Sequence, residues 1–530
     1  MDYVIVGGGS AGCVLAARLS EDPRVQVTLL EAGPPDRSVL IHCPAGLGLM
    51  ARSPRARHGY NWAFQTVPQP GLDGRRGYQP RGKVLGGSSS INAMIYTRGA
   101  PADYDAWAAE GNAGWGWADV LPVFKAAEHN ERGADAFHGS GGPLNVADLR
   151  DPNPFSLAFV EAGVQAGHAR NPDFNGATQE GVGLYQVTHK NGERFSAAKA
   201  YLTPNRARPN LHVLTGAHAT RVLLEQGRAV GVAYVQGGRE RQVRAEREVI
   251  LSAGALQSPQ LLMLSGIGPA DHLRQLDIAV RHDLPGVGAH LHDHPDVVQV
   301  WDADRAYDLF GLSLPGGWRA ARAIGQWRRE RRGPLTSNFA EAGGFIKSDP
   351  AEPLPDLQLH FVVGKLVDHG RATVFGHGFS CHVCVLRPNS RGSLRLASAD
   401  PLAAPLIDPA FLRDADDVRR LVAGFKLMRD VLRQPALARH GGVERSAAAQ
   451  SNAEIEAFIR QHADTIYHPA GSCRMGQGPL DVVDHHLRVR GVDGLRVVDA
   501  SVMPSLVGGN TNAPVIMIAE QAAALMRAAA

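Results

Sequence analysis

The segment "TIYHPAGSCRMG" at residues 465–476 contains several residue types that can take part in catalysis or ligand binding. His468 stands directly before Pro469, and Cys473 and Arg474 follow shortly after it. An imidazole with an unperturbed pKa near ~6.5 can be neutral at pH ~7 and can accept a proton from a substrate. The same histidine could bind a metal ion or lie inertly in a hydrophobic core. The segment alone leaves these three interpretations open.

The case for a catalytic or metal-binding role is weaker for the other reactive residues of the chain. Cys473 matches no known spacing for a cysteine–histidine pair, and Arg474 beside it suits binding to backbone or cofactor better. The histidines of "HLHDHP", residues 290–295, would share one face of an extended segment, which is compatible with metal ligands. A structural loop is the favoured interpretation there. The only C-x-x-C motif, Cys381 and Cys384, has no second pair to complete a zinc site.

The N-terminal stretch "VIVGGGSAGCVLAARL" carries the pattern G-x-G-x-x-G at Gly7, Gly9 and Gly12. Gly7 permits a tight turn, Gly9 lets backbone N–H groups approach a pyrophosphate, and Gly12 lets a helix pack closely on the preceding strand. A second apolar strand follows and ends at Glu31, whose carboxylate can accept hydrogen bonds from an adenosine ribose. The sequence therefore predicts a dinucleotide site, and the pattern leaves NAD and FAD open.

The elements that must position these residues can be read in outline. The first thirty residues predict a strand, a helix and a second, parallel strand. The glycine–serine segment "RGKVLGGSSSINAMIYTRG" is expected to run into a helix after Ser90. Strand-like segments return from about residue 210, and the alternating stretches between 295 and 445 indicate a mostly antiparallel sheet. Ser451 and Glu454 have capping-box spacing at the start of a helix.

Composition narrows the class of protein. A chain of 530 residues with 44% hydrophobic and 20% charged residues predicts a globular protein of two or three domains. A net charge of +3 gives no reason to expect nucleic acid as a partner. Five cysteines without a disulfide pattern fit a reducing cytosol. No apolar run reaches the roughly 18 residues of a membrane span, which leaves only peripheral membrane contact open.

Four segments in this order resemble the glucose-methanol-choline (GMC) oxidoreductases, a family of FAD-dependent alcohol oxidases and dehydrogenases. They are the N-terminal glycine pattern, "GKVLGGSSSINAMIYTRG" at 82–99, "GALQSPQLLMLSGIG" at 254–268, and the C-terminal pair "YHPAGSCRMG" and "VVDASVMPSLVGGNTNAPVIMIAE". The likeness is strongest to the bacterial choline dehydrogenase and alcohol dehydrogenase branch. It implies an α/β fold, with a Rossmann-like FAD-binding domain built from discontinuous segments and an α+β substrate domain with a mostly antiparallel sheet.

The resemblance also implies domain limits and cofactor contacts. Residues 1–150, 205–295 and 460–530 would form the FAD-binding domain, and residues 151–204 and 296–459 the substrate domain. Val222 would touch the adenine side, and Asp499 and Ala500 the ribityl and phosphate region. The full set of expected FAD contacts is Gly7, Gly9, Ser10, Ala11, Gly12, Glu31, Val84, Gly86, Gly87, Asn92, Ala93, Met94, Ile95, Val222, Tyr467, Asp499 and Ala500.

The implied chemistry is oxidation of a primary alcohol to an aldehyde. His468 matches the family histidine at the flavin N5 face and would take the hydroxyl proton, while Asn512 matches its partner and would hold the alcohol oxygen. Some relatives attach FAD covalently to a histidine at the place of Ile91, which has no nucleophile, so FAD is expected to be non-covalent. A flavin-containing lyase on the same fold is the alternative.

The remaining expectations concern partners and location. The substrate is a small alcohol, and a quinone-type acceptor or oxygen reoxidises the flavin. No metal and no nucleic acid are expected. The protein is expected in the cytoplasm, with peripheral attachment to the inner membrane left open.

Overall fold

The structure is a computed structural model that describes residues 1–50 and 59–528. One of its two large sheets is parallel and five-stranded, in the order β10-β2-β1-β14-β27. Its strands come from distant parts of the chain and are short, apolar and mostly buried on both faces, as strands of a parallel sheet must be. They are β1 (Tyr3–Val6), β2 (Val27–Glu31), β10 (Leu211–Thr215), β14 (Glu248–Leu251) and β27 (Leu495–Val497).

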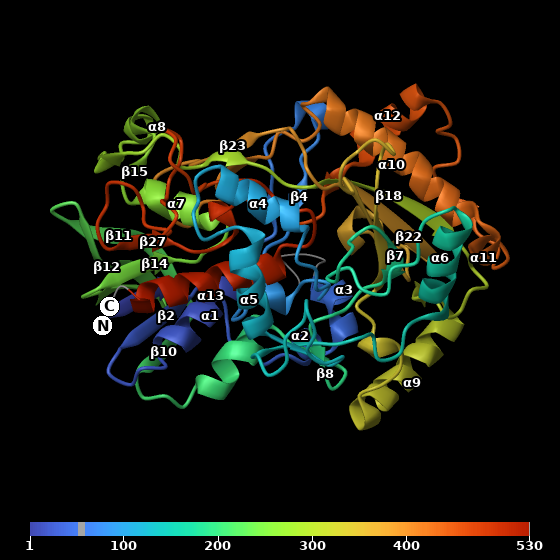
Figure 1. The fold of residues 1–530 in the computed structure, drawn as a ribbon, viewed down its shortest axis with the longest axis horizontal. Coiled ribbons are helices and arrows are strands. Elements are labelled where there is room, and N and C mark those ends of the chain that lie inside the picture. The colour runs from blue at the N-terminus through green and yellow to red at the C-terminus, as the bar shows by residue number, and fades with distance from the viewer. Residues whose placement is uncertain (51–58, 529–530) are drawn as a thin grey trace.

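Two helices pack against each other beside this sheet. Helix α1 (Ser10–Leu19) follows the glycine turn, and the C-terminal helix α13 (Asn512–Ala528) lies along it (Figure 1). Glu520 of α13 ties the pair together, because its carboxylate accepts hydrogen bonds from Arg18 and Tyr201. Both helices begin on the same side of the molecule, where Ser10 and Asn512 are hydrogen-bonded to each other.

The second large sheet has eight strands, and the pairings along it are antiparallel. It lies on the opposite side of the molecule from the parallel sheet (Figure 1). The long helices α6 (Pro154–Gln165) and α10 (Ala415–Arg433) pack on it. Its strands are β7 (Gly181–Leu184), β18 (Pro295–Asp302), β19 (Gly311–Leu312), β20 (Ala340–Ile346), β21 (Leu357–Val362), β22 (Gly376–Val385), β25 (Val443–Glu444) and β26 (Asp464–Thr465). The expected combination of a parallel sheet and a mostly antiparallel sheet is confirmed.

The remaining elements connect or flank the two sheets. Helix α12 (Asn452–His462) begins with the expected capping box, since Ser451 and Glu454 exchange hydrogen bonds. The other helices are α2 (Val39–His42), α3 (Leu47–Met50), α4 (Pro101–Ala109), α5 (Trp117–Ala127), α7 (Gln257–Leu264), α8 (Ala270–Gln275), α9 (Leu314–Glu330) and α11 (Pro435–Ala438). The other strands are β3 (Phe64–Gln65), β4 (Tyr78–Gln79), β5 (Glu128–Asn130), β6 (Leu144–Val146), β8 (His189–Lys190), β9 (Glu193–Arg194), β11 (Ala217–Glu225), β12 (Arg228–Gln236), β13 (Arg239–Arg244), β15 (Ile267–Gly268), β16 (His282–Asp283), β17 (Ala289–Leu291), β23 (Gly392–Arg395) and β24 (Leu406–Asp408).

The expected helix after Ser90 does not form. Residues Gly87–Ser90 make one 3-10 turn, and no helix begins again before Pro101. The Asn92 side chain accepts the backbone N–H of Met94, which has a left-handed φ of 59°. A side chain that bonds locally to its own backbone competes with a helix, and the segment is held open here.

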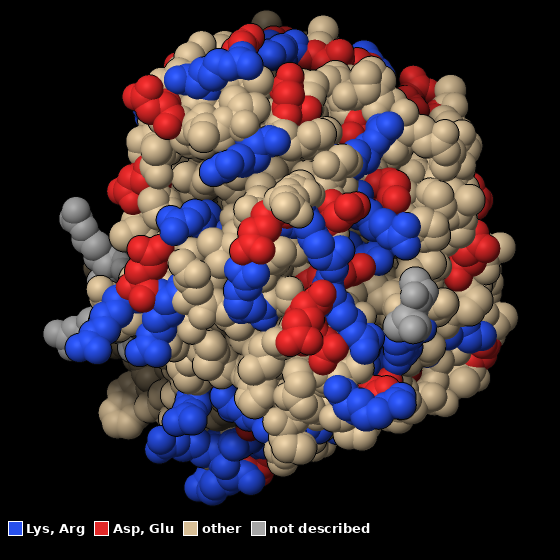
Figure 2. All heavy atoms as spheres, turned by 90° about the vertical axis from the view of Figure 1, so that its left-hand side faces the viewer, with Lys and Arg blue, Asp and Glu red and all other residues tan. Residues whose placement is uncertain are grey.

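Charges of both signs are mixed on one face of the molecule. Figure 2, which views the left-hand side of Figure 1, shows basic and acidic side chains intermixed over most of that face. Among the described residues, none of the helices combines the length and the apolar character needed to span a bilayer.

Candidate active site

A cavity of about 790 Å³ extends from the N-terminal glycine turn to His468. Its size lies within the range of roughly 300–1,000 Å³ typical of small-molecule and cofactor sites. Both sheets and their connections supply its wall. Most of the expected cofactor contacts line it: Gly7, Gly9, Ser10, Ala11, Glu31, Gly87, Asn92, Ala93, Met94, Ile95, Tyr467, Asp499 and Ala500.

The glycine turn is shaped as the sequence predicts. Gly7 has a φ of 100°, and a Cβ there would lie 2.4 Å from the carbonyl oxygen of Ser252. A Cβ on Gly12 would lie 1.9 Å from the carbonyl oxygen of Gly7, so α1 packs directly against the turn. A Cβ on Gly9 would meet nothing nearer than 3.9 Å. The backbone at Gly9 is therefore open to the cavity, beside the start of α1, where N–H groups favour an anion.

Glu31 is fixed in the cavity wall. Its two carboxylate oxygens accept backbone N–H groups of Gly8 and Gly33, at 2.8 and 2.7 Å. Burial raises the pKa of this carboxyl to about 7, although the two N–H groups oppose that shift. An ionised carboxylate has about four acceptor positions, so Glu31 retains capacity to accept hydroxyl groups from a bound ribose.

The second glycine segment, at residues 82–99, packs against the N-terminal glycine turn. A Cβ on Gly87 would come within 2.6 Å of Gly9 Cα, and the N–H of Gly86 donates to the carbonyl of Gly8 at 2.7 Å. Val84 is fully buried in a small cluster with Ile41 and Met50. Gly12, Val84 and Gly86 thus lie behind the cavity wall and shape it, and they are not among the residues that line it.

Val222 lies away from the cavity. It is buried in the hydrophobic core on β11, and its N–H donates to Ser265 Oγ at 2.8 Å, at the end of α7. The cavity is lined instead by Ala217, His218 and Ala219, from the start of the same strand. β11 runs on from the cavity into the region that α7 covers, so only the beginning of the strand lines the cavity.

Asp499 organises the turn that follows β14. Its carboxylate accepts the N–H of Gly254 at 2.9 Å and the hydroxyl of Ser258 at 2.5 Å, and burial raises its pKa. The glycine turn, the open backbone at Gly9 and the partly free Glu31 together fit a dinucleotide. The lining then continues through Ile91, Asn92 and Ala500 to His468 without a break in the cavity. These residues therefore suit FAD, which has a reactive ring at one end and an adenosine at the other.

His468 is nearly buried, at 8% exposure, and lines the cavity. Its backbone N–H donates to Asp293 Oδ1 at 2.8 Å. The ring contacts two partners: Nδ1 lies 3.0 Å from Nδ1 of His294, and Nε2 lies 3.2 Å from Nδ2 of Asn510. Because an amide nitrogen only donates, Nε2 of His468 accepts, and its Nδ1 carries the proton that His294 accepts. This tautomer presents a basic nitrogen at Nε2.

The protonation state agrees with that tautomer. Burial lowers the pKa of His468 well below its usual value, and repulsion from Arg81 and from any protonated form of His294 or His360 acts in the same direction. The imidazole is therefore neutral near pH ~7, as a proton acceptor must be. Burial likewise lowers the pKa of His294 to about 3, so His294 remains a neutral acceptor.

The amide beside His468 is Asn510, not the expected Asn512. Asn510 Oδ1 accepts hydrogen bonds from Thr97 Oγ1 at 3.2 Å and Gln358 Nε2 at 3.1 Å, which turns its NH₂ group toward His468. Asn512 also lines the cavity, but its Oδ1 accepts the Ser10 hydroxyl at 2.7 Å. The repeated asparagine in "GGNTNAP" made the two positions hard to separate by sequence.

Two further histidines were not selected from the sequence. His294 comes from the "HLHDHP" loop and its ring contacts that of His468, and no group of potential metal ligands occurs among the described residues. His360 is buried, lines the cavity, and has no hydrogen-bond partner for either ring nitrogen within the part of the chain that the structure describes. The alternating strand "DLQLHFVV" contained the only signal for His360. The five cysteines are buried and free, and burial raises the pKa of Cys473 well above its usual value.

Known proteins match nearly the whole length of this chain. Family models described as GMC oxidoreductase match residues 1–296 and 388–519. The chain belongs to the GMC oxidoreductase family. It is 50% identical to an alcohol dehydrogenase (acceptor) of Pseudomonas putida, over 99% of this chain and 95% of that protein. It is 46% identical to the mitochondrial choline dehydrogenase of Homo sapiens, over 99% of this chain and 89% of that protein.

Solved structures of this family have the same fold. Pyridoxine 4-oxidase from Mesorbium loti superimposes with a TM-score of 0.88 at 35% identity, over 99% of each chain. Membership in the GMC family makes this chain an FAD-dependent oxidoreductase acting on CH–OH donors, and the expectations of family, fold, cofactor and enzyme class are confirmed. The lyase alternative is not favoured by these relatives.

Proposed function

We propose that this GMC oxidoreductase oxidises uncharged primary alcohols to aldehydes, with His468 as the base that removes the hydroxyl proton. The observation that carries the proposal is a neutral imidazole whose Nε2 accepts from Asn510 in the wall of the cofactor cavity. When bound, FAD supplies the hydride acceptor. The parallel sheet is then the centre of the FAD-binding domain and the antiparallel sheet that of the substrate domain.

The chain's own residues supply proton transfer and positioning. Nε2 of His468 accepts the hydroxyl proton, and His294 keeps the other ring nitrogen engaged so that the basic nitrogen faces the cavity. The Asn510 NH₂ group has a second N–H available for the alcohol oxygen. A base and a donor on the same oxygen fix the carbinol carbon in one orientation.

The wall beside His468 favours an apolar substrate. Ile95, Val362 and Ile466 belong to one hydrophobic cluster that Phe339 and Tyr467 pack against, and all of these residues line the cavity. The lining carboxylates in the described part of the chain are Glu31 and Asp499, which are held by backbone and hydroxyl donors in the predicted nucleotide region. A quaternary ammonium such as choline is bound by acidic or aromatic partners, and Phe339 and Tyr467 are aromatic, but no lining carboxylate of the described residues lies outside the predicted nucleotide region. An alcohol with an apolar chain fits this wall better.

An anaerobic flavin-reduction assay tests the base. His468→Ala is expected to retain flavin but to reduce it at least about 10²-fold more slowly with a short apolar primary alcohol, because general-base catalysis contributes roughly 10²–10⁴-fold. His440→Ala, a change at an exposed histidine, is the matched control. Near-normal reduction in His468→Ala would remove the base from the mechanism. Faster reduction by choline than by the apolar alcohol would contradict the substrate proposal alone.

We also propose that FAD is held without a covalent bond. Ile91, the position at which some relatives carry a linking histidine, lines the cavity with a side chain that cannot react. Acid precipitation should leave the yellow flavin in the supernatant, and flavin that stays with the pellet would contradict this. The reduced cofactor is reoxidised by a quinone-type acceptor or by oxygen, and a stopped-flow mixing experiment with each distinguishes them.

A further inference from the structure

The surface beside the cavity mouth exposes large apolar side chains. Leu314, Trp318 and Phe375 are 88%, 81% and 77% exposed. Leu312 and Ala320 are also exposed and line the cavity, so the cavity reaches the surface here. Leu312 forms a β-bridge with Phe375, which joins the two segments. We call this group the mouth patch: Leu312, Leu314, Trp318, Ile324 and Phe375.

Helix α9 carries most of the mouth patch and projects at the edge of the molecule, on the side of the antiparallel sheet (Figure 1). Its inner side packs through Ala323 and Trp327, which are its buried residues. Leu314 and Trp318, four residues apart, share the outward side. Water-exposed apolar side chains on one helical face have no explanation within the fold of the described chain.

The same helix is strongly basic. Between Leu314 and Arg332 the only acidic residue is Glu330, whereas the arginines are Arg319, Arg322, Arg328, Arg329, Arg331 and Arg332. Arg319, Arg331 and Arg332 form ion pairs with Asp308, Glu193 and Asp151. Arg322, Arg328 and Arg329 are exposed and have no acidic partner within residues 1–50 and 59–528. Their positive charge is therefore available to an external anion.

We propose that α9 and the mouth patch dock the protein on the surface of a bilayer that contains anionic phospholipids. An exposed helix that carries leucine and tryptophan beside unpaired arginines, with little net hydrophobicity, can lie in the interface between headgroups and acyl chains. Unpaired arginines add electrostatic attraction to anionic headgroups. A second copy of the chain fits less well, because a symmetric contact would bring the arginines of one copy against those of the other.

Docking in this orientation would place the cavity mouth at the acyl chains. An apolar alcohol or a membrane-borne acceptor could then enter past Leu312 and Ala320 without crossing water. Entry of an alcohol or acceptor from the membrane rests on the proposed function, whereas docking itself does not. Vesicle binding and flavin reduction are therefore measured separately.

The test is co-sedimentation of the flavin-loaded protein with vesicles. One set contains phosphatidylglycerol and phosphatidylcholine in equal parts, and the other contains phosphatidylcholine alone. We expect binding to the anionic vesicles, weakened at least about tenfold in Leu314→Ser/Trp318→Ser by loss of buried apolar area. Arg322→Gln/Arg329→Gln should also weaken it about tenfold or more, with a loss of salt dependence.

The control is Arg239→Gln/Arg241→Gln, which removes two exposed arginines from β13. It should bind vesicles as the unaltered protein does, and all three variants should retain flavin and its reduction by alcohol. Absence of binding to anionic vesicles, equal binding to both kinds, or unchanged binding in the α9 variants would overturn the proposal. A concentration-dependent dimer that Trp318→Ser dissociates, without vesicle binding, would overturn it in favour of a second copy.

Discussion

At the scale of single residues, the site depends on which atoms of His468 are engaged. His294 and Asn510 contact opposite ring nitrogens, so the pair determines the tautomer as well as the orientation of the imidazole. Neither partner is near His468 in sequence: His294 precedes it by 174 residues and Asn510 follows by 42. His294 acts through His468 and is a positioning residue.

Mutations of the two asparagines of "GGNTNAP" are expected to have different effects. Asn510→Ala removes the donor to the alcohol oxygen and should slow anaerobic flavin reduction about 10-fold or more, since a hydrogen bond to a developing charge contributes roughly 1.5–3 kcal/mol. Asn512→Ala removes the partner of Ser10 at the start of α13 and should act mainly on flavin content. Stopped-flow reduction and the ratio of flavin to protein measure the two effects. If Asn512→Ala alone slowed reduction, the assignment of Asn510 would be wrong.

At the scale of elements, the nucleotide region depends on close backbone approaches. Helix α1 can begin at Ser10 only because Gly12 lies against the carbonyl of Gly7, and the second glycine segment can approach only because Gly87 lies against Gly9. The N-termini of α1 and α13 meet at the same place, where Ser10 and Asn512 are joined. Two helix N-termini favour negative charge in the cavity between them.

Gly12→Ala is the sharpest test of this packing. The added Cβ would lie 1.9 Å from the Gly7 carbonyl oxygen, a contact that only a shift of α1 or the turn can relieve. Overpacking of this kind costs about 1–3 kcal/mol, and the displaced turn should lower the flavin content of the purified protein. Gly325→Ala on α9 is the control, because its Cβ would have nothing within 4 Å. Equal flavin content in the two variants would show that the contact is easily accommodated.

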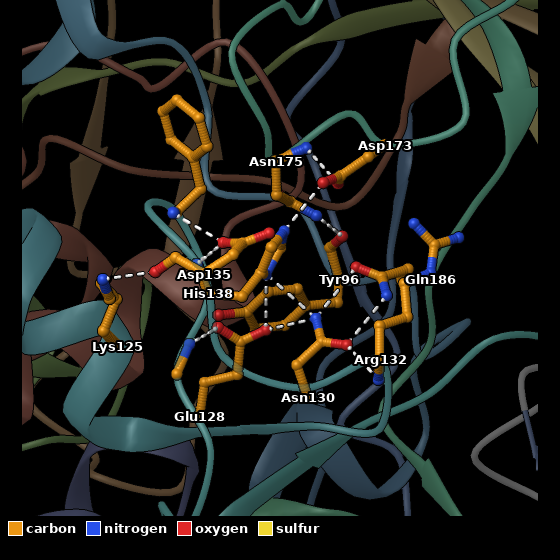
Figure 3. A network of polar contacts seen from close by, with 12 residues as sticks. Tyr96, Lys125, Glu128, Asn130, Arg132, Asp135, His138, Asp173, Asn175 and Gln186 are labelled. Carbon is orange, nitrogen blue, oxygen red and sulfur yellow. Dashed lines mark hydrogen bonds and ion pairs between the residues drawn. The ribbon is translucent and has the colours of Figure 1, made fainter.

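At the scale of the whole molecule, a buried network of hydrogen bonds and ion pairs connects segments that are distant in the sequence (Figure 3). His138 Nε2 lies 2.8 Å from Asp173, and its Nδ1 lies 3.1 Å from Glu128, which is also paired with Arg98. Asn130 connects Glu128 to Gln186 (Figure 3). Burial lowers the pKa of His138, but the hydrogen bonds to Asp173 and Glu128 outweigh it and raise the pKa to about 9.

This network predicts a pH-dependent stability. The pKa of His138 is about 9 in the folded protein and about 6.5 in the unfolded chain. The stabilisation by charged His138 is therefore complete below about pH 6.5 and is lost as the pH rises through about 9. Urea unfolding from pH ~6 to ~9.5 should show a larger loss of stability in the unaltered protein than in His138→Gln. His462→Gln, at an exposed histidine, should behave like the unaltered protein. Parallel pH profiles for all three proteins would exclude this role of His138.

The sequence by itself determined the local features, because each needs only neighbouring residues. The glycine turn at Gly7 to Gly12, the helix that follows it, the acidic end of β2 at Glu31 and the capping box at Ser451 are set by spacing along the chain. The motif order also identified the family and its cofactor before any contact was known. His468 was selected for the same reason, since its motif is contiguous.

The tertiary structure decided which distant side chains meet. Asn510 rather than Asn512 faces His468 because Thr97 and Gln358, from other segments, hold its oxygen. His294 joins the site because its loop crosses the segment that carries His468. Val222 does not line the cavity, because β11 continues beneath α7 at that point. Exposure of Leu314 and Trp318 is likewise a property of how α9 packs, since the same apolar pattern in a sequence is compatible with a buried helix.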